Sequence, residues 1–309
     1  MAKVKVAAMI RSWDERTGVS PAMTLAAARN AEAAGLDGLV VGDHVTFYGY
    51  GNDGLITLTA VATVTERIEL KTCVYLLPLR HVVPVALQTA QLAQLSGGRL
   101  NFGVGVGGED PHEFTSCGVD PKTRGARTNE ALAVLRRLWT EDEVTFAGTH
   151  FQLDAVTVYP KPTTPPPIFI GGRSDAALRR AGRFGDGYTG IWQSVKRMRQ
   201  AGEFMSEVAL EAGRATDAVE LGMQFWTGVA PQRDEARGFV ARAMEATYQL
   251  PFERFEKYTP FGTAEEVASF IAPYVEAGAR HVNLIGTQAT PEQNIERAAE
   301  VREALLRMT

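Results

Sequence analysis

Residues 82–105 read VVPVALQTAQLAQLSGGRLNFGVG and contain one complete step from a helix to a strand. A helix is predicted over Val82–Leu95, and Ser96-Gly97-Gly98 ends it because glycine readily leaves the helical conformation. The short apolar run Arg99–Gly105 then predicts a buried strand.

The same step recurs along the whole chain. Apolar runs predict further strands over Val4–Ile10, Gly38–Val41, Ile68–Leu77, Ile168–Ile170, Asp186–Thr189, Val219–Val229 and His281–Ile285. Helices are predicted over Pro21–Ala34, Leu55–Thr65, Arg124–Trp139, Ser174–Phe184, Ser194–Gly213, Arg233–Gln249, Thr263–Ala277 and Pro291–Leu306. Short parallel strands that each lead into a helix favour a closed (β/α)8 TIM barrel, an α/β fold, over an open doubly wound sheet.

One segment interrupts the alternation. Glu143–Tyr159 has apolar residues at every second position on either side of Gly148-Thr149. This pattern predicts a β-hairpin inserted between strands four and five. No linker or repeat divides the chain, so we expect one domain over residues 1–309.

Composition excludes several classes of function. The net charge is −4, which does not favour a nucleic acid or an anionic membrane as partner. No apolar run is long enough for a membrane helix, and the first residues lead straight into a strand without the apolar core of a signal peptide. The five histidines are not spaced as metal ligands. Two cysteines suggest no disulfide framework, so we expect a cytoplasmic protein without a metal site.

Catalytic residues of this fold gather where each strand leads into the following loop. Asp43 and His44 follow strand two. A histidine there could act as a general acid or base near neutral pH, with Asp43 orienting it or binding a cofactor. The competing interpretation of His44 is an ordinary structural histidine.

The loop after strand four is rich in glycine. Gly103–Gly108 matches the spacing G-x-G-x-x-G, but no helix opens at its third glycine, which the dinucleotide fingerprint requires. We therefore expect the backbone of this loop to approach a flat ring or a phosphate closely. A plain loop remains the alternative. The cofactor candidates here are Gly105, Val106 and Gly107.

The loop after strand five is a glycine turn that leads into a helix. Gly171 and Gly172 precede Arg173 and the expected N-cap Ser174. Free backbone N–H groups, the helix dipole and the arginine together predict a phosphate site. An ordinary capped turn is the alternative.

These motifs resemble those of the luciferase-like monooxygenase superfamily, and the resemblance covers nearly the whole chain. The matching stretches are LSGGRLNFGVGVG at 95–107, PPIFIGGRS at 166–174, GDG at 185–187 and FGTAEEV at 261–267, with Asp43-His44 ahead of them. The family fold is a barrel with a β-hairpin insertion. Its cofactor is reduced FMN, which supports monooxygenation, or the deazaflavin coenzyme F-420, which transfers hydride.

The resemblance favours the deazaflavin branch. Asp43-His44 resembles the Asp-His pair of that branch, whose histidine faces the substrate. Thr72-Cys73-Val74 resembles its strand-three bulge, which implies a cis peptide between Cys73 and Val74 lying against the deazaflavin ring. A buried cysteine with no role at the site is the alternative for Cys73.

The chain also departs from the sugar-phosphate dehydrogenases of that branch. They carry a glutamate at the end of strand one, where this chain has Ile10-Arg11-Ser12-Trp13, and a tryptophan where it has Phe47-Tyr48. Their acidic residue after the glycines of strand four is shifted here, and the resemblance makes Glu109 the nearest cofactor candidate. These departures argue against oxidation of a glucose-6-phosphate-like substrate.

We therefore expect a deazaflavin-dependent oxidoreductase acting on a small organic substrate. The alternatives are an FMN-dependent monooxygenase supplied by a partner reductase and a non-catalytic flavin-binding barrel. A homodimer is expected by resemblance alone.

Overall fold

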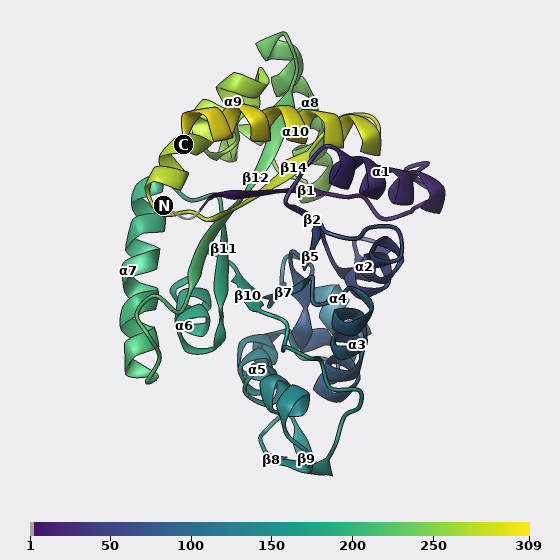
Figure 1. Ribbon diagram of the computed structural model, residues 1–309, viewed down its shortest axis with the longest axis vertical. Helices are drawn as coiled ribbons and strands as arrows, with labels where there is room; N and C mark the ends of the chain where they lie inside the picture. The colour runs from purple at the N-terminus through teal and green to yellow at the C-terminus, as the bar shows by residue number, and fades with distance from the viewer. Residues whose placement is uncertain (1–2) are drawn as a thin grey trace.

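The chain folds into a closed parallel barrel surrounded by helices (Figure 1). This is a computed structural model, and it describes residues 3–309. The strands of the wall are β1 (Lys5–Met9), β2 (Gly38–Val41), β5 (Glu69–Thr72), β7 (Leu100–Gly105), β10 (Ile168–Gly171), β11 (Gly187–Ile191), β12 (Glu220–Val229) and β14 (His281–Gly286). They pair in this order, and β14 pairs with β1 to close the ring. The predicted TIM barrel is confirmed, and the open sheet is excluded.

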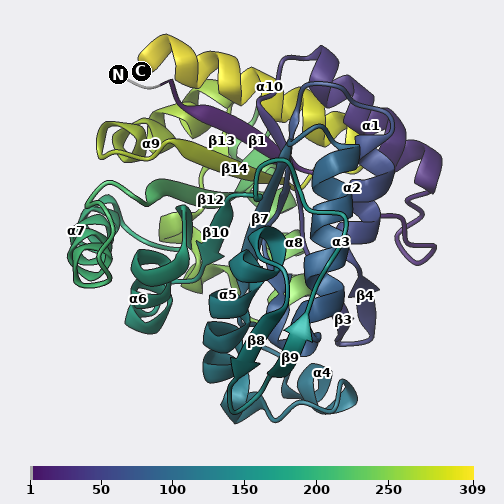
Figure 2. The same ribbon diagram turned by 60° about the horizontal axis from the view of Figure 1, so that its bottom comes forward.

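Helices cover the outside of the wall (Figures 1 and 2). They are α1 (Pro21–Ala33), α2 (Gly54–Ala62), α3 (Val82–Leu95), α5 (Arg124–Thr140), α6 (Asp175–Phe184), α7 (Val195–Glu211), α8 (Arg233–Tyr248), α9 (Ala264–Glu276) and α10 (Pro291–Met308). Most begin at a side-chain cap that local sequence predicts: Ser20 accepts from the amide of Met23, and Thr263 forms a capping box with Glu266.

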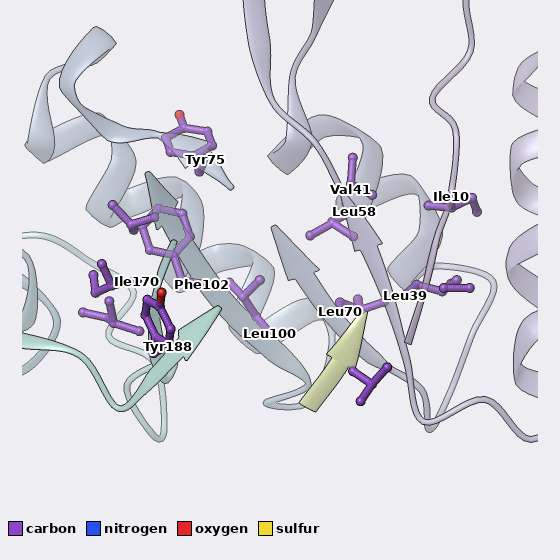
Figure 3. Close-up of a cluster of buried hydrophobic side chains, with 14 of the residues drawn as sticks. Ile10, Leu39, Val41, Leu58, Leu70, Tyr75, Leu100, Phe102, Ile170 and Tyr188 are labelled. Atoms are coloured by element: carbon purple, nitrogen blue, oxygen red, sulfur yellow. The ribbon is translucent and has the colours of Figure 1, made fainter. Parts of the chain in front are cut away.

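The apolar core lies between the barrel wall and the helices. Alternate residues along each strand face outward, and this face carries large apolar side chains such as Leu39, Leu70, Phe102 and Ile170 (Figure 3). Tyr75 belongs to the same cluster and is almost fully buried. This layer accounts for the apolar runs from which the strands are predicted, because one face of every strand is packed against a helix.

The inside of the barrel contains buried charged and polar side chains. Lys71 lies over the ring of Phe169, and its Nζ is 3.5 Å from Nδ1 of His281. His281 in turn bonds to Glu220 through Nε2 at 2.6 Å. Burial lowers the pKa of Lys71 to about 8, because charge is costly away from water.

The β-hairpin insertion is present as predicted. β8 (Val144–Ala147) pairs antiparallel with β9 (Gln152–Val156), and in Figure 2 the pair projects beside α5. The turn is held by Glu130 of α5, whose carboxylate accepts from the amides of Thr149 and His150.

Two further elements were not predicted, and both lie at the C-terminal end of the barrel. The loop after β2 forms a second hairpin, in which β3 (His44–Phe47) pairs with β4 (Tyr50–Asn52). The expected long loop over 106–123 contains a short helix, α4 (Pro111–Ser116). Strand three is also interrupted at residues 73–74 before β6 (Tyr75–Leu76), rather than running unbroken to Leu77.

Candidate active site

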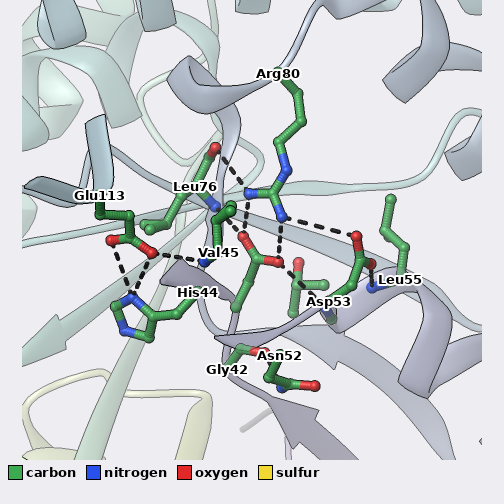
Figure 4. Close-up of polar contacts among 12 residues, drawn as sticks. Gly42, His44, Val45, Asn52, Asp53, Leu55, Leu76, Arg80 and Glu113 are labelled. Carbon is green, nitrogen blue, oxygen red and sulfur yellow. Dashed lines mark hydrogen bonds and ion pairs between the residues drawn. The ribbon is translucent and has the colours of Figure 1, made fainter. Parts of the chain in front are cut away.

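His44 is held at the mouth of the barrel by a carboxylate from α4. Its Nδ1 lies 3.2 Å from Oε1 and 3.3 Å from Oε2 of Glu113, as Figure 4 shows. The same carboxylate accepts from the backbone amide of Val45 at 2.6 Å. Glu113 is 1% exposed and His44 29% exposed, so the carboxylate is buried beneath a ring that reaches solvent.

This contact assigns the two ring nitrogens different roles. A carboxylate at Nδ1 favours the tautomer that carries the proton there. Nε2 makes no hydrogen bond with any residue from 3 to 309, and in Figure 4 it points away from Glu113. Although burial opposes ionisation, His44 and the backbone amides lower the pKa of Glu113. The pair therefore presents one free imidazole nitrogen to the mouth, where it could take or give a proton.

Asp43 positions the loop that carries His44. Its carboxylate is fully buried and pairs with Arg80 at 2.5 and 2.8 Å, while it also accepts from the amides of Leu76 and Gly54. These bonds use the acceptor positions of both oxygens. Asp43 therefore has no free acceptor position for a direct bond to a cofactor. The role of Asp43 as a cofactor ligand stays a prediction.

Val74 forms a raised surface at the top of the barrel. The peptide bond between Cys73 and Val74 is cis, as the resemblance implies. The two methyl groups of Val74 fill the spaces where Cβ atoms of Gly105 and Gly171 would lie. These two glycines are therefore explained first by the packing of Val74, rather than by direct contact with a ring or phosphate.

Cys73 points into the barrel beneath this surface. Its thiol donates to Oε1 of Gln224 at 2.7 Å, and the amide of Asn283 lies 3.5 Å from the sulfur. Burial raises the pKa of Cys73 to about 11, so the thiol stays protonated at neutral pH. The thiol belongs to the polar interior and is not a nucleophile of the mouth.

The loop after β7 makes a sharp turn. Gly107 and Gly108 have positive φ values of 60° and 123°, conformations that favour glycine. Val106 is half-buried, and Glu109 is exposed at the rim. The Glu109 carboxylate forms no hydrogen bond with His44, and the part of Val106 and Glu109 in cofactor binding stays a prediction.

The loop after β10 has the features of an anion site. Gly172 has φ of 134°, and a Cβ there would lie 2.8 Å from that of Ala177. Ser174 caps α6, as predicted. The backbone N–H groups of Arg173 and Ser174 donate to nothing within residues 3–309. Arg173 itself is exposed and lies over the ring of Trp192 at 5.3 Å.

Buried polar atoms without partners lie beside this loop. Within residues 3–309 they are Oγ1 of Thr189, Nε1 of Trp192, Oε1 of Gln193 and Oδ1 of Asn283. Three of the four come from β11 and the two residues after it, and the Thr189 carbonyl of β11 accepts from the amide of Gly172 at 3.3 Å. Buried polar groups usually find a partner, so this side of the mouth fits a polar cofactor or substrate.

Sequence reasoning missed Glu113 and Arg80. The signal for Glu113 was present, because Asp110-Pro111 is a helix start and the structure confirms Asp110 as the cap of α4. Nothing in the sequence pairs Arg80 with Asp43, which lies 37 positions away. No group of three or more His, Cys, Asp or Glu side chains within residues 3–309 could hold a metal ion. None of the helices in that range is long and apolar enough to cross a membrane.

Comparison with known proteins agrees with this architecture. Residues 3–307 match the profile of the luciferase-like monooxygenase family. The chain is 31% identical over 284 residues to the F420-dependent glucose-6-phosphate dehydrogenase of Kineococcus radiotolerans, covering 82% of this chain and 83% of that protein. The chain therefore belongs to the luciferase-like monooxygenase family, and it is an oxidoreductase of that family.

Solved structures support the fold. An F420-dependent secondary alcohol dehydrogenase in complex with an F420-acetone adduct superposes with a TM-score of 0.85 at 24% identity, covering 98% of this chain and 99% of that one. The oxygenating constituent of 3,6-diketocamphane monooxygenase from Pseudomonas putida, in complex with FMN, has a TM-score of 0.78 at 17% identity, covering 99% of each chain. The fold is thus shared by enzymes of both cofactor types.

Proposed function

We propose that this chain is an oxidoreductase that transfers hydride between the deazaflavin coenzyme F-420 and a small organic substrate. The observation that carries the proposal is the His44–Glu113 pair, which leaves Nε2 of His44 free at the mouth. Relatives of the chain that match over most of their length are named as F420-dependent dehydrogenases.

The residues of the mouth fit such a cofactor. Val74 offers a firm surface on which a flat ring could lie, because its methyl groups are fixed between Gly105 and Gly171. The open amides of Arg173 and Ser174 suit the phosphate of the cofactor tail. When bound, the deazaflavin supplies a ring carbon that gives or accepts hydride.

His44 takes up or supplies the proton that accompanies hydride transfer. Oxidising an alcohol releases a proton from oxygen, and reducing a ketone requires one at the same atom. Nε2 of His44 takes or gives that proton, while Glu113 keeps Nδ1 protonated and the ring in place. Turnover therefore depends on both residues, although only His44 touches the substrate.

The second candidate is an FMN-dependent monooxygenase with a partner reductase. The shared fold of the FMN-bound camphane enzyme supports it. A free imidazole nitrogen positioned by a carboxylate suits proton transfer coupled to hydride better than oxygen activation. A homodimer and a cytoplasmic location belong to the proposal as expectations from the family.

Titration with each cofactor tests the proposal. We expect F-420 to bind with micromolar affinity, followed by its fluorescence, and FMN to bind at least about tenfold more weakly. Gly172→Val is expected to weaken binding, because the new side chain would meet Ala177 and close the turn around the phosphate.

The matched control is Gly278→Val. Gly278 also has a positive φ, of 106°, but it precedes β14 at the opposite end of the barrel. It therefore reports the cost of backbone strain alone. Equal affinity for both cofactors would overturn the deazaflavin assignment. Unchanged affinity in a folded Gly172→Val protein would overturn the phosphate site.

A further inference from the structure

Arg11 continues the row of inward-facing residues of β1. Along that strand Ala7 and Met9 face the barrel interior, where they pack with Val40 and Cys73. Ile10, which lies between Met9 and Arg11, faces the outer core. Arg11 therefore follows Met9 on the inner side, at the C-terminal end of the strand where the mouth opens.

The surroundings of Arg11 place its guanidinium near two loops of the mouth. One nitrogen donates to the carbonyl of Gln288, in the loop after β14, at 3.3 Å. The charge of Arg11 also acts on the hydroxyl of Tyr50 in β4, the hairpin partner of the strand that carries His44. The side chain is only partly exposed.

Arg11 has no carboxylate partner. Two other arginines near the same hairpin are paired: Arg80 with Asp43, and Arg16 with Asp14 at 3.0 Å. Within residues 3–309 no acidic oxygen lies within 4.0 Å of Arg11. Its single hydrogen bond leaves most of its five N–H donors unused.

This arrangement is costly unless a ligand completes it. Burial lowers the pKa of Arg11, which is a measure of that cost, yet an arginine stays charged at any working pH. A half-buried guanidinium without a counter-charge gains most from a planar anion that accepts two parallel hydrogen bonds.

We propose that Arg11 binds a carboxylate group of the substrate, so that the chain acts on a small organic acid that carries an alcohol or carbonyl. The proposal rests on the proposed function, since it names the substrate class of the same mouth. One unpaired guanidinium matches the single charge and planar shape of a carboxylate. A phosphate dianion would call for more than one cation.

Calorimetric titration with benzoate and benzamide tests this inference. The two probes have nearly the same shape but differ in charge. We expect benzoate to bind wild-type protein at least about tenfold more tightly than benzamide, a difference of about 1.4 kcal/mol. Arg11→Gln is expected to remove this preference. Arg11→Lys should retain part of it, because lysine keeps the charge but lacks the two parallel N–H donors of the guanidinium. The matched control, Arg16→Gln, removes an exposed arginine already paired with Asp14 and should leave the preference intact.

Stability separates a binding role from a structural one. If Arg11 serves the substrate, Arg11→Gln should melt at or above the wild-type temperature, because a partly buried, uncompensated charge is removed. A lower melting temperature with an unchanged benzoate preference would make Arg11 a structural residue and overturn the proposal. Tighter binding of phenyl phosphate than of benzoate would overturn the choice of a carboxylate.

Titrations on protein with and without F-420 keep this inference distinct from the proposed function. Failure of F-420 to bind would overturn the cofactor assignment and leave the benzoate preference measurable. If Arg11→Gln instead weakened F-420 binding as much as benzoate binding, Arg11 would belong to the cofactor site and the substrate role would be wrong.

Discussion

The side chain of Val74 occupies the space that a Cβ atom at Gly105 would need. Val74 lies in the interruption of strand three, and Gly105 ends β7, the neighbouring strand. The glycine is therefore required by a neighbour on the next strand, and the surface offered at the mouth belongs to Val74.

Gly105→Ala is expected to displace Val74 and to lower the free energy of unfolding by about 1–3 kcal/mol, the usual cost of overpacking. Chemical denaturation measures the loss, and F-420 titration measures the effect on the mouth. The double variant Val74→Ala/Gly105→Ala should recover much of the stability, because the methyl groups in the way are gone. A single variant as stable as wild type would show that Val74 is free to move.

His44→Ala is expected to lower turnover by about 10² or more while F-420 affinity changes by no more than a few-fold. The reason is that Nε2 is the free nitrogen of the mouth, and an alanine supplies no proton. Steady-state turnover beside a cofactor titration measures both quantities. Full turnover in the variant would contradict the acid–base role. Weaker F-420 binding with normal turnover of the loaded enzyme would make His44 a cofactor ligand.

Glu113→Gln is expected to lower turnover by about tenfold or more, because an amide no longer fixes the tautomer of His44. F-420 affinity should stay unchanged. The decisive comparison is the double variant His44→Ala/Glu113→Gln, measured by the same steady-state assay. If Glu113 acts through His44, the double variant is as slow as His44→Ala alone. A further drop in the double variant would give Glu113 an independent role.

Lys71→Met is expected to raise the free energy of unfolding at pH 7 by up to about 3 kcal/mol. The pKa of Lys71 is lowered from 10.5 to about 8 in the folded protein, because burial disfavours the charge. Between about pH 8 and 10.5 the folded protein binds fewer protons than the unfolded chain. Wild-type stability should therefore rise as the pH rises through that range.

Denaturation at pH 7 and pH 10 measures this dependence on the wild type and on Lys71→Met, with the exposed Lys196→Met as control. The variant at Lys71 should lose the rise in stability over that range, and the control should keep it. A Lys71→Met protein less stable than wild type at pH 7 would show that the contacts with His281 and Phe169 outweigh the cost of burial.

The sequence by itself determined the barrel. Apolar runs, glycine stops and caps are local signals, and a cap such as Ser20 or Thr263 acts within three residues of itself. Because these signals need no distant partner, the alternation of strands and helices is encoded locally in the sequence. His44 and the turn at Gly172 are predicted as site residues on the same kind of signal, since this fold places the ends of its strands at one face.

Only the tertiary structure decided how the site is built. Glu113 meets His44 across 69 positions, and Arg80 meets Asp43 across 37. Arg11 follows the inner side of β1 with no acidic oxygen within 4.0 Å inside residues 3–309, which no pattern along the chain reveals. Such relationships depend on how the ring of strands closes and how the loops fold over it. Hydrogen bonds and charge pairs act over a few ångströms in space, so a linear sequence does not specify which distant groups meet.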